Sequence, residues 1–210
     1  MRIEITSLYS KNSGEEVVVT FALTSDDAQS TDRHSFTLSA KQYLILSPTK
    51  GESDADTFDA VSHAATVWQA TKRGIYILGY GACSEKALAA KLVAKGFDRQ
   101  TAREAVNEIV ARGLIRPNDD AAREAQRQAA KLWGKSRVIS ALYEKGYSAE
   151  AVGAAMDALE ASGIDYVENC RALIRKKYAE IPTDAKARAK IVAALARYGY
   201  SMSEIKQALL

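Results

Sequence analysis

Three short stretches of this chain repeat one another: LVAKGF at residues 92–97, LYEKGY at 142–147 and LARYGY at 195–200. Each of them contains Leu, then three variable residues, then Gly and an aromatic residue. Gly is the usual residue just beyond a helix, because it adopts the left-handed conformation without a Cβ penalty and lets the next residue pack back onto the helix. A good N-cap for another helix follows each Gly-aromatic pair: Asp98, Ser148 and Ser201. Each stretch therefore predicts a helix, a stop and a second helix.

The same stop recurs once more after the first two stretches. Gly113-Leu114 and Gly163-Ile164 each lie 17 residues beyond the preceding Gly. A further helical pattern precedes each stretch, at residues 57–80, 119–133 and 165–180. The chain thus contains three helices in about 50 residues, three times over, and we assign the repeats to residues 57–115, 116–164 and 165–210.

Repeats that bury their faces against their neighbours form extended bodies. The fold class that we expect is therefore mainly α, with three tandem three-helix repeats forming an elongated curved body, preceded by a small N-terminal β segment.

The first 56 residues have a different pattern. Ile3 and Ile5 alternate with polar residues, Asn12-Ser13-Gly14 is a turn sequence, and residues 17–21 are a β-branched and aromatic run. This order predicts a β-hairpin, with residues 35–38 as a candidate third strand. Residues 47–56 contain Pro and Gly and read as a linker. We therefore assign residues 1–56 to an N-terminal β-hairpin or strand extension with a linker.

Composition limits the class of protein. The 210 residues are 47% apolar and 26% charged, which is typical of a globular chain. The net charge of +3 is uneven, because the first 60 residues carry −5 and the rest +8, so the helical part is the one suited to a polyanion. Two cysteines without CxxC spacing predict neither a disulfide framework nor a zinc site. No apolar run approaches the roughly 18 residues of a membrane span. We expect a cytoplasmic monomer with no membrane partner.

The residues that enzymes use do not form a recognisable motif. The chain has two histidines and contains no HExxH, GxSxG, Walker A or GxGxxG sequence. Asp119-Asp120 could be imagined as a metal pair, but such a pair is more often the start of a helix, where carboxylates favour the helix dipole. We therefore expect no enzyme, no catalytic residue, no cofactor and no metal.

Basic residues are the candidate contacts. One group recurs every four residues and would share a helix face: Arg123, Arg127, Lys131 and Lys135. A second group lies in the third repeat: Arg171, Arg175, Lys176, Lys186, Arg188 and Lys190. These side chains suit phosphates or the surface of a filament, although each by itself could be an ordinary solvated residue. Trp133 and Tyr198 lie near them and could stack on bases, while their helical spacing favours packing in the core.

Three longer stretches carry a resemblance: SEKALAAKLVAKGF, GLIRPNDDAAREAQRQAAKLWGKSRVISALYEKGY and IVAALARYGYSMSEIKQAL. In this order they strongly resemble the RecX regulatory proteins of bacteria. That family shows Ser-Glu-x-x-Leu ahead of Lys-Leu-x-x-Lys-Gly, then Gly-Leu-Ile/Leu-Asp-Asp, and a closing Arg-Gly-Phe-Ser. The resemblance covers about residues 60–210, and the β segment looks like an extension that some members carry. Tyr198 stands where the family usually has Arg.

The resemblance implies a regulator of the RecA recombinase. Such proteins bind along the RecA filament on single-stranded DNA, inhibit strand exchange and ATP hydrolysis, and limit filament growth or hasten its disassembly. The implied partners are the RecA filament and, weakly or through RecA, single-stranded DNA.

Two other classes of protein remain open from the residues alone. The helix–stop–helix units have the spacing of helix-turn-helix DNA-binding proteins, although only Asp98-Arg99-Gln100 resembles the start of a recognition helix. The third alternative is a protein–protein scaffold without a nucleic-acid role, whose binding would be insensitive to salt.

Overall fold

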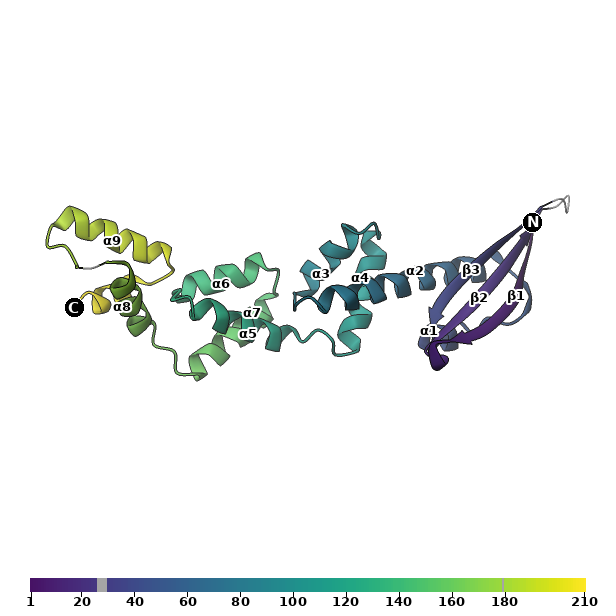
Figure 1. The fold of residues 1–210 in the computed structure, drawn as a ribbon, viewed down its shortest axis with the longest axis horizontal. Helices are drawn as coiled ribbons and strands as arrows, with labels where there is room; N and C mark the ends of the chain where they lie inside the picture. Colours follow the sequence, from purple (N-terminus) through teal and green to yellow (C-terminus); the bar gives the residue numbers. More distant parts are fainter. Residues whose placement is uncertain (26–29, 179) are drawn as a thin grey trace. The chain divides into compact units, whose positions relative to one another are not determined.

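A computed structural model describes residues 1–25, 30–178 and 180–210, which are mostly helical (Figure 1). The chain divides into two compact units. The first unit contains Met1–Tyr80 and Ala89–Arg112, and the second contains Gly81–Leu88 and Gly113–Leu210. The helices and the small antiparallel sheet at the N-terminus confirm the expected mainly α class with an N-terminal β segment. Within the described residues, no helix is both long and apolar enough to cross a membrane.

The first unit begins with an antiparallel sheet of four strands. These are β1 (Arg2–Lys11), β2 (Glu16–Thr24), β3 (Thr31–Ser39) and β4 (Gly51–Ser53), in the order β3-β2-β1-β4. The predicted turn is a short 3-10 segment, Asn12–Gly14, between β1 and β2. Strand β4 lies inside the segment that reads as a linker, and it pairs with Ile3 to Ile5 of β1. The β segment is thus larger than a hairpin.

Helices of the first unit cover one face of this sheet. Helix α1 (Ala40–Leu46) follows β3 directly, and the long helix α2 (Ala55–Leu78) places Val61 and Ala65 against Phe21 and Leu38 of the sheet. Helix α4 (Arg99–Ala111) packs on α2. Burial of these alternating strand residues against one helix face is the main source of stability here.

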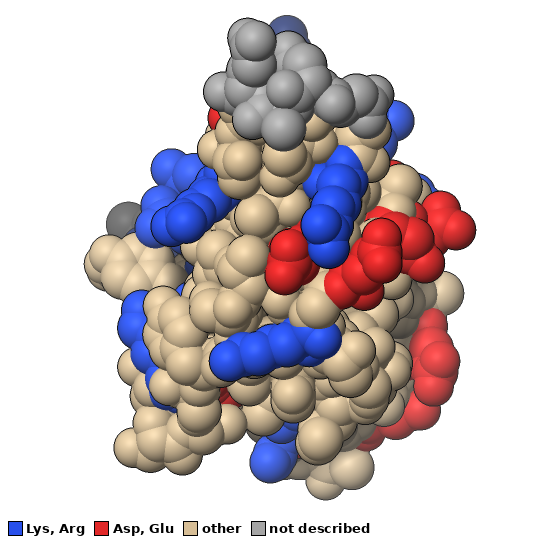
Figure 2. Space-filling model, turned by 90° about the vertical axis from the view of Figure 1, so that its right-hand side faces the viewer, with Lys and Arg blue, Asp and Glu red and all other residues tan. Residues whose placement is uncertain are grey.

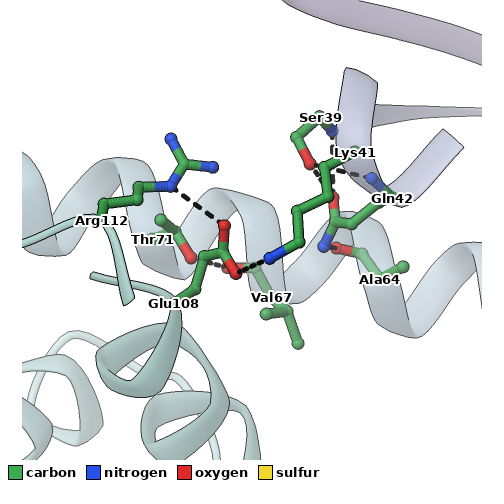
Figure 3. Close-up of polar contacts among 8 residues, drawn as sticks. All are labelled: Ser39, Lys41, Gln42, Ala64, Val67, Thr71, Glu108 and Arg112. Carbon is green, nitrogen blue, oxygen red and sulfur yellow. Dashed lines mark hydrogen bonds and ion pairs between the residues drawn. The ribbon is translucent and has the colours of Figure 1, made fainter. Parts of the chain in front are cut away.

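Polar side chains connect α1, α2 and α4 (Figure 3). Glu108 of α4 accepts hydrogen bonds from Lys41 Nζ and from Arg112 Nε, each at 3.0 Å. Gln42 donates to the backbone carbonyl of Ala64 at 2.8 Å. Ser39 and Gln42 form a capping box, which explains why α1 begins where it does.

Figure 2 shows both acidic and basic side chains on the side of the molecule that it draws. Most of the acidic ones gather on one side of this view, and the basic ones are spread over the rest. On the sheet, hydroxyl groups pair across strands, as Thr20 with Ser35 at 3.1 Å and Thr24 with Thr31 at 3.4 Å. Because the basic side chains in Figure 2 are spread out, this side of the molecule is poorly suited to bind a polyanion.

The second unit contains two three-helix groups. Helices α5 (Pro117–Ala129), α6 (Lys135–Glu144) and α7 (Ala149–Ala161) enclose one apolar core. Helices α8 (Tyr166–Lys177), α9 (Ala185–Arg197) and α10 (Met202–Ala208) enclose the next. Helix α3 (Glu85–Val93) begins among residues of the second unit and ends among those of the first.

The helix stops have the predicted geometry. Gly96, Gly146 and Gly199 all have positive φ angles, of 97°, 83° and 90°. The amide of the following aromatic residue donates to the carbonyl of the Leu five positions earlier, at 3.2–3.3 Å in all three copies. This is the hydrogen bond of the Schellman motif, so the repeated stretch does end each helix as expected.

Two of these glycines also contact the start of another helix. Gly146 lies against Ser84 and Lys86 at the start of α3, and the Ser84 hydroxyl donates to the carbonyl of Lys145 at 2.6 Å. Gly199 lies against Gly134 and Arg137 at the start of α6. Gly96 has nothing within 4 Å of the position of a Cβ. The glycine of the second and third stretch therefore has a packing role that the first one lacks.

Backbone hydrogen bonds strengthen the contact at Gly199. The amide of Gly134 donates to the carbonyl of Tyr198 at 2.8 Å, and the amide of Ser136 donates to the carbonyl of Gly199 at 3.2 Å. The free N–H groups at the start of α6 thus meet the free carbonyls at the end of α9, so each helix end satisfies the other. We call this contact the repeat joint.

Candidate nucleoprotein interface

The four basic residues predicted on one helix face do not share a helix, because α5 ends at Ala129. Arg123 and Arg127 lie on α5, Lys131 follows its end and Lys135 begins α6. The first three each contact a polar residue three positions earlier. Arg123 pairs with Asp120 at 2.5 Å, Arg127 pairs with Glu124 at 3.2 Å, and Lys131 donates to Gln128 at 3.0 Å. The guanidinium side chains are 65% and 63% exposed, whereas the two carboxylate side chains are only 7% and 6% exposed. The helix therefore buries an acidic row and exposes a basic one.

Glu124 is the centre of a buried polar group. Lys145 of the loop after α6 contacts it at 2.7 Å, and Gln128 donates to it as well. Burial alone would raise the pKa of Glu124, but the hydrogen bonds from Lys145 and Gln128 and the nearby positive charges hold the pKa below its ordinary value. Glu124 stays ionised and cancels part of the positive charge of α5.

Lys135 also has an acidic partner. Its ammonium group pairs with Glu160 of α7, which lies 25 residues later. Of the four predicted residues of this row, three are therefore bound to carboxylates. Asp120, considered above as half of a metal pair, accepts from the backbone amide of Arg116 and thus stabilises the start of α5. Among the described residues, no three His, Cys, Asp or Glu side chains cluster as a metal site would require.

Three arginines of the third repeat have structural partners. Arg171 and Arg175 share Glu168, at 3.6 and 2.6 Å. Arg171 also donates to the backbone carbonyl of Gln207 at 2.9 Å, and Arg188 donates to that of Leu209 at 3.4 Å. Guanidinium groups at the C-terminal end of a helix satisfy its last carbonyls and favour its dipole. Two of the predicted contacts therefore help to hold α10.

Three predicted lysines remain available. Lys176, Lys186 and Lys190 are exposed, and within residues 1–25, 30–178 and 180–210 they have no ion pair or hydrogen bond. Lys186 and Lys190 are one turn apart on α9, so they share a face. We call these three residues the lysine surface. It is the part of the predicted site that a polyanion could contact without breaking an existing pair.

A stack of alternating cations and aromatic rings was not predicted. The ring centre of Trp133 lies 5.2 Å from Lys131 and 4.0 Å from Arg137, and that of Tyr198 lies 5.0 Å from Arg137 and 4.4 Å from Lys177. Both rings are also packed against the helix cores, as their spacing favoured. Each ring already makes contacts with two cations, and these contacts would compete with the stacking of a base. The stack instead reinforces the repeat joint.

Charge around Tyr198 changes its acidity. The hydrogen bond from Lys177 and the positive charges of Lys177 and Arg137 hold the pKa of Tyr198 below its ordinary value. Trp133 and Arg137 are only four residues apart, although Trp133 precedes the N-cap of α6 and does not share a helix with Arg137. The contacts of Tyr198 join residues far apart in sequence, and no local pattern predicts them.

Comparisons with known proteins agree with this architecture. The family described as "RecX, third three-helix domain" matches residues 164–209. The regulatory protein RecX of Xanthomonas axonopodis pv. citri (strain 306) is 33% identical over 126 residues, which are 60% of this chain and 76% of that protein. The regulatory protein RecX of Stenotrophomonas maltophilia (strain R551-3) is 35% identical over 129 residues, with the same coverage of 60% and 76%.

Two solved structures have a similar fold. A crystal structure of regulatory protein RecX matches with a TM-score of 0.75 at 17% identity and covers 98% of each chain. The crystal structure of RecX from Lactobacillus salivarius matches with a TM-score of 0.58 at 20% identity, over 70% of this chain and 96% of that one.

Proposed function

Because this chain belongs to the RecX family of regulatory proteins, we propose that it binds the RecA filament on single-stranded DNA and restrains its activity. The observation that carries the proposal is the similarity to regulatory proteins RecX, which runs through three quarters of their length. In this proposal the protein inhibits strand exchange and ATP hydrolysis during recombination and DNA repair. It acts in the cytoplasm as a monomer, without a cofactor.

The distribution of basic side chains without carboxylate partners supports a function in which the protein acts by binding to a polyanionic partner. The lysine surface presents three exposed ammonium groups without a carboxylate partner in the described residues, whereas the cations of α5 are largely bound to carboxylates. A protein that neutralises phosphates releases counterions, so its binding weakens as salt is added. We propose that the lysine surface faces the polyanionic filament, and that single-stranded DNA is touched weakly or through RecA.

ATP turnover by RecA tests this proposal. We expect purified protein to suppress the single-stranded-DNA-dependent ATP hydrolysis of a bacterial RecA, in proportion to its concentration. The variant with Lys176→Glu, Lys186→Glu and Lys190→Glu should need about tenfold more protein for the same suppression, because three contacts change sign. The measurement is phosphate release at fixed RecA and DNA.

A variant of equal charge change provides the control. Lys50, Lys91 and Lys95 are exposed lysines of the first unit, and their replacement by Glu should leave the suppression within about twofold of the wild type. Unchanged ATP turnover at a large excess of wild-type protein would contradict the proposed function. Equal losses in both variants would contradict the assignment of the lysine surface.

A further inference from the structure

An apolar groove runs between α9 and α10. It encloses about 840 Å³ and is lined by side chains of both helices. Ala189, Ala193 and Ala196 form its floor on α9, and Met202, Ile205 and Leu209 line it on α10. The three alanines are exposed, and Met202 is 52% exposed. Exposed apolar surface that is continuous over two helices is typical of a binding site.

Cations border this groove. Lys186, Lys190 and Arg197 are exposed on α9 outside the residues that line the groove, and Lys190 lines a neighbouring pocket with Asp184. Arg188 and Lys206 are themselves among the lining residues, which include no Asp or Glu within the described part of the chain. The groove therefore combines an uncharged floor with positive margins.

The three-helix fold itself does not require this apolar floor. In the second repeat the corresponding positions lie 53 residues earlier, and Ser136 and Ser140 of α6 stand in place of Ala189 and Ala193. The Ser140 hydroxyl donates to the carbonyl of Ser136 on an exposed surface. The alanine floor is thus a property of the third repeat, and Ser140 of the second repeat offers a matched polar position.

We propose that this groove binds an amphipathic helix with acidic flanks from a partner protein. Small side chains on the floor let a second helix approach to the usual 8–10 Å between axes. An apolar stripe of the partner would cover the alanines, and its Glu or Asp residues would meet the cations on both margins. A phosphate backbone has no apolar face to bury here, and no aromatic side chain lines the groove for base stacking in the described residues.

This inference goes beyond the proposed function, because it names the chemistry of a protein partner and holds whether or not that partner is RecA. A designed peptide serves as the probe. It carries fluorescein and about 16 residues of Leu and Glu, with Leu on one helical face, which is long enough to span α9 at 1.5 Å per residue. A scrambled peptide of the same composition and a fluorescein-labelled oligo-dT are measured beside it by fluorescence anisotropy.

Ala193→Glu is the test variant and Ser140→Glu is its control. Both positions are exposed on helices, Glu is a good helix former, and both changes add one negative charge. We expect Ala193→Glu to weaken binding of the patterned peptide at least about tenfold, because the new carboxylate meets the apolar stripe and the acidic flanks. Ser140→Glu should change it less than about twofold, and the scrambled peptide should bind the wild type far more weakly.

Other results would overturn the inference. The inference would be contradicted if the patterned peptide did not bind or if the scrambled peptide bound as tightly. It would also be contradicted if Ala193→Glu and Ser140→Glu weakened binding of the patterned peptide equally. Oligo-dT binding that Ala193→Glu abolishes, with the peptide unaffected, would assign the groove to nucleic acid instead. Because no RecA is present, failure here is distinguishable from failure of the proposed function, which the ATP turnover assay measures separately.

Discussion

Replacing Gly199 with Ala should destabilise the second unit by about 3 kcal/mol. Two physical effects add at this position. The φ angle of 90° costs a residue with a Cβ about 1–2 kcal/mol. The added methyl would also fall on the backbone nitrogen of Arg137 and lie 2.9 Å from the carbonyl oxygen of Gly134. Overpacking of this kind typically costs about 1–3 kcal/mol, and here backbone atoms would have to move. Urea unfolding gives the measurement.

Two further variants separate the effects. Gly134 has a φ of −72°, so Gly134→Ala adds no backbone strain, but its methyl would fall on the backbone of Gly199. Gly163 has a φ of 78° and nothing within 4 Å, so Gly163→Ala adds strain alone. We expect losses of about 2 kcal/mol for Gly134→Ala and about 1 kcal/mol for Gly163→Ala. If Gly134→Ala proved as stable as the wild type, the close packing of Gly134 on Gly199 that defines the repeat joint would be contradicted.

Replacing Glu16 with Ala should destabilise the first unit by about 3 kcal/mol. The carboxylate of Glu16 on β2 is nearly buried and accepts from the indole of Trp68 and from Lys72, both at 2.7 Å. Its loss leaves the indole N–H of Trp68 and the ammonium group of Lys72 without this partner and removes a polar contact between α2 and the sheet. Glu15 is exposed beside it, and Glu15→Ala should cost less than about 0.5 kcal/mol.

The contribution of Glu16 to the stability of the first unit should depend on pH. The hydrogen bond from Lys72 holds the pKa of Glu16 below its ordinary value, and Trp68 and the charge of Lys72 act in the same direction. A carboxyl with a lowered folded-state pKa stabilises the fold above its unfolded-state pKa, and this contribution is lost as the pH falls through the lowered value. The difference between wild type and Glu16→Ala should therefore be full at pH 7 and shrink below about pH 4. A difference that is constant down to pH 3 would contradict the ionised pair.

The helix boundaries were predictable because their signals are local. Gly146 and Gly199 end their helices through the two or three residues around them, and Ser148 and Ser201 start the next ones. Strand β4 has only three residues and exists because β1 pairs with it, so no local pattern marks it. The capping box of Ser39 and Gln42 was present in the sequence and could have revealed α1. The packing role of Gly199 depends on Gly134, 65 residues earlier.

The residues of the candidate site and their i, i+3 pairs, such as Arg127 with Glu124, could be predicted from spacing, but the long-range pairs could not. Periodicity placed Arg127 on a basic face, and the structure places it there. Whether that charge is free depends on Glu124 and on Lys145, which comes from another part of the repeat. Likewise, the partner of Lys135 lies on α7 and that of Arg188 lies at the end of α10. Sequence spacing identifies cations, whereas tertiary contacts decide which of them stay available.

Binding of the protein to RecA filaments is the most direct test of the account. The protein, labelled with a fluorophore, is titrated with filaments that RecA forms on oligo-dT in a non-hydrolysable ATP analogue, and with the same oligo-dT alone. We predict a saturable rise in anisotropy with filaments, weakened by added salt and by the three Glu replacements in the lysine surface, and a much smaller rise with bare oligo-dT. No rise with filaments, or an equal rise with bare oligo-dT, would contradict the central claim that this protein acts by contact with the filament.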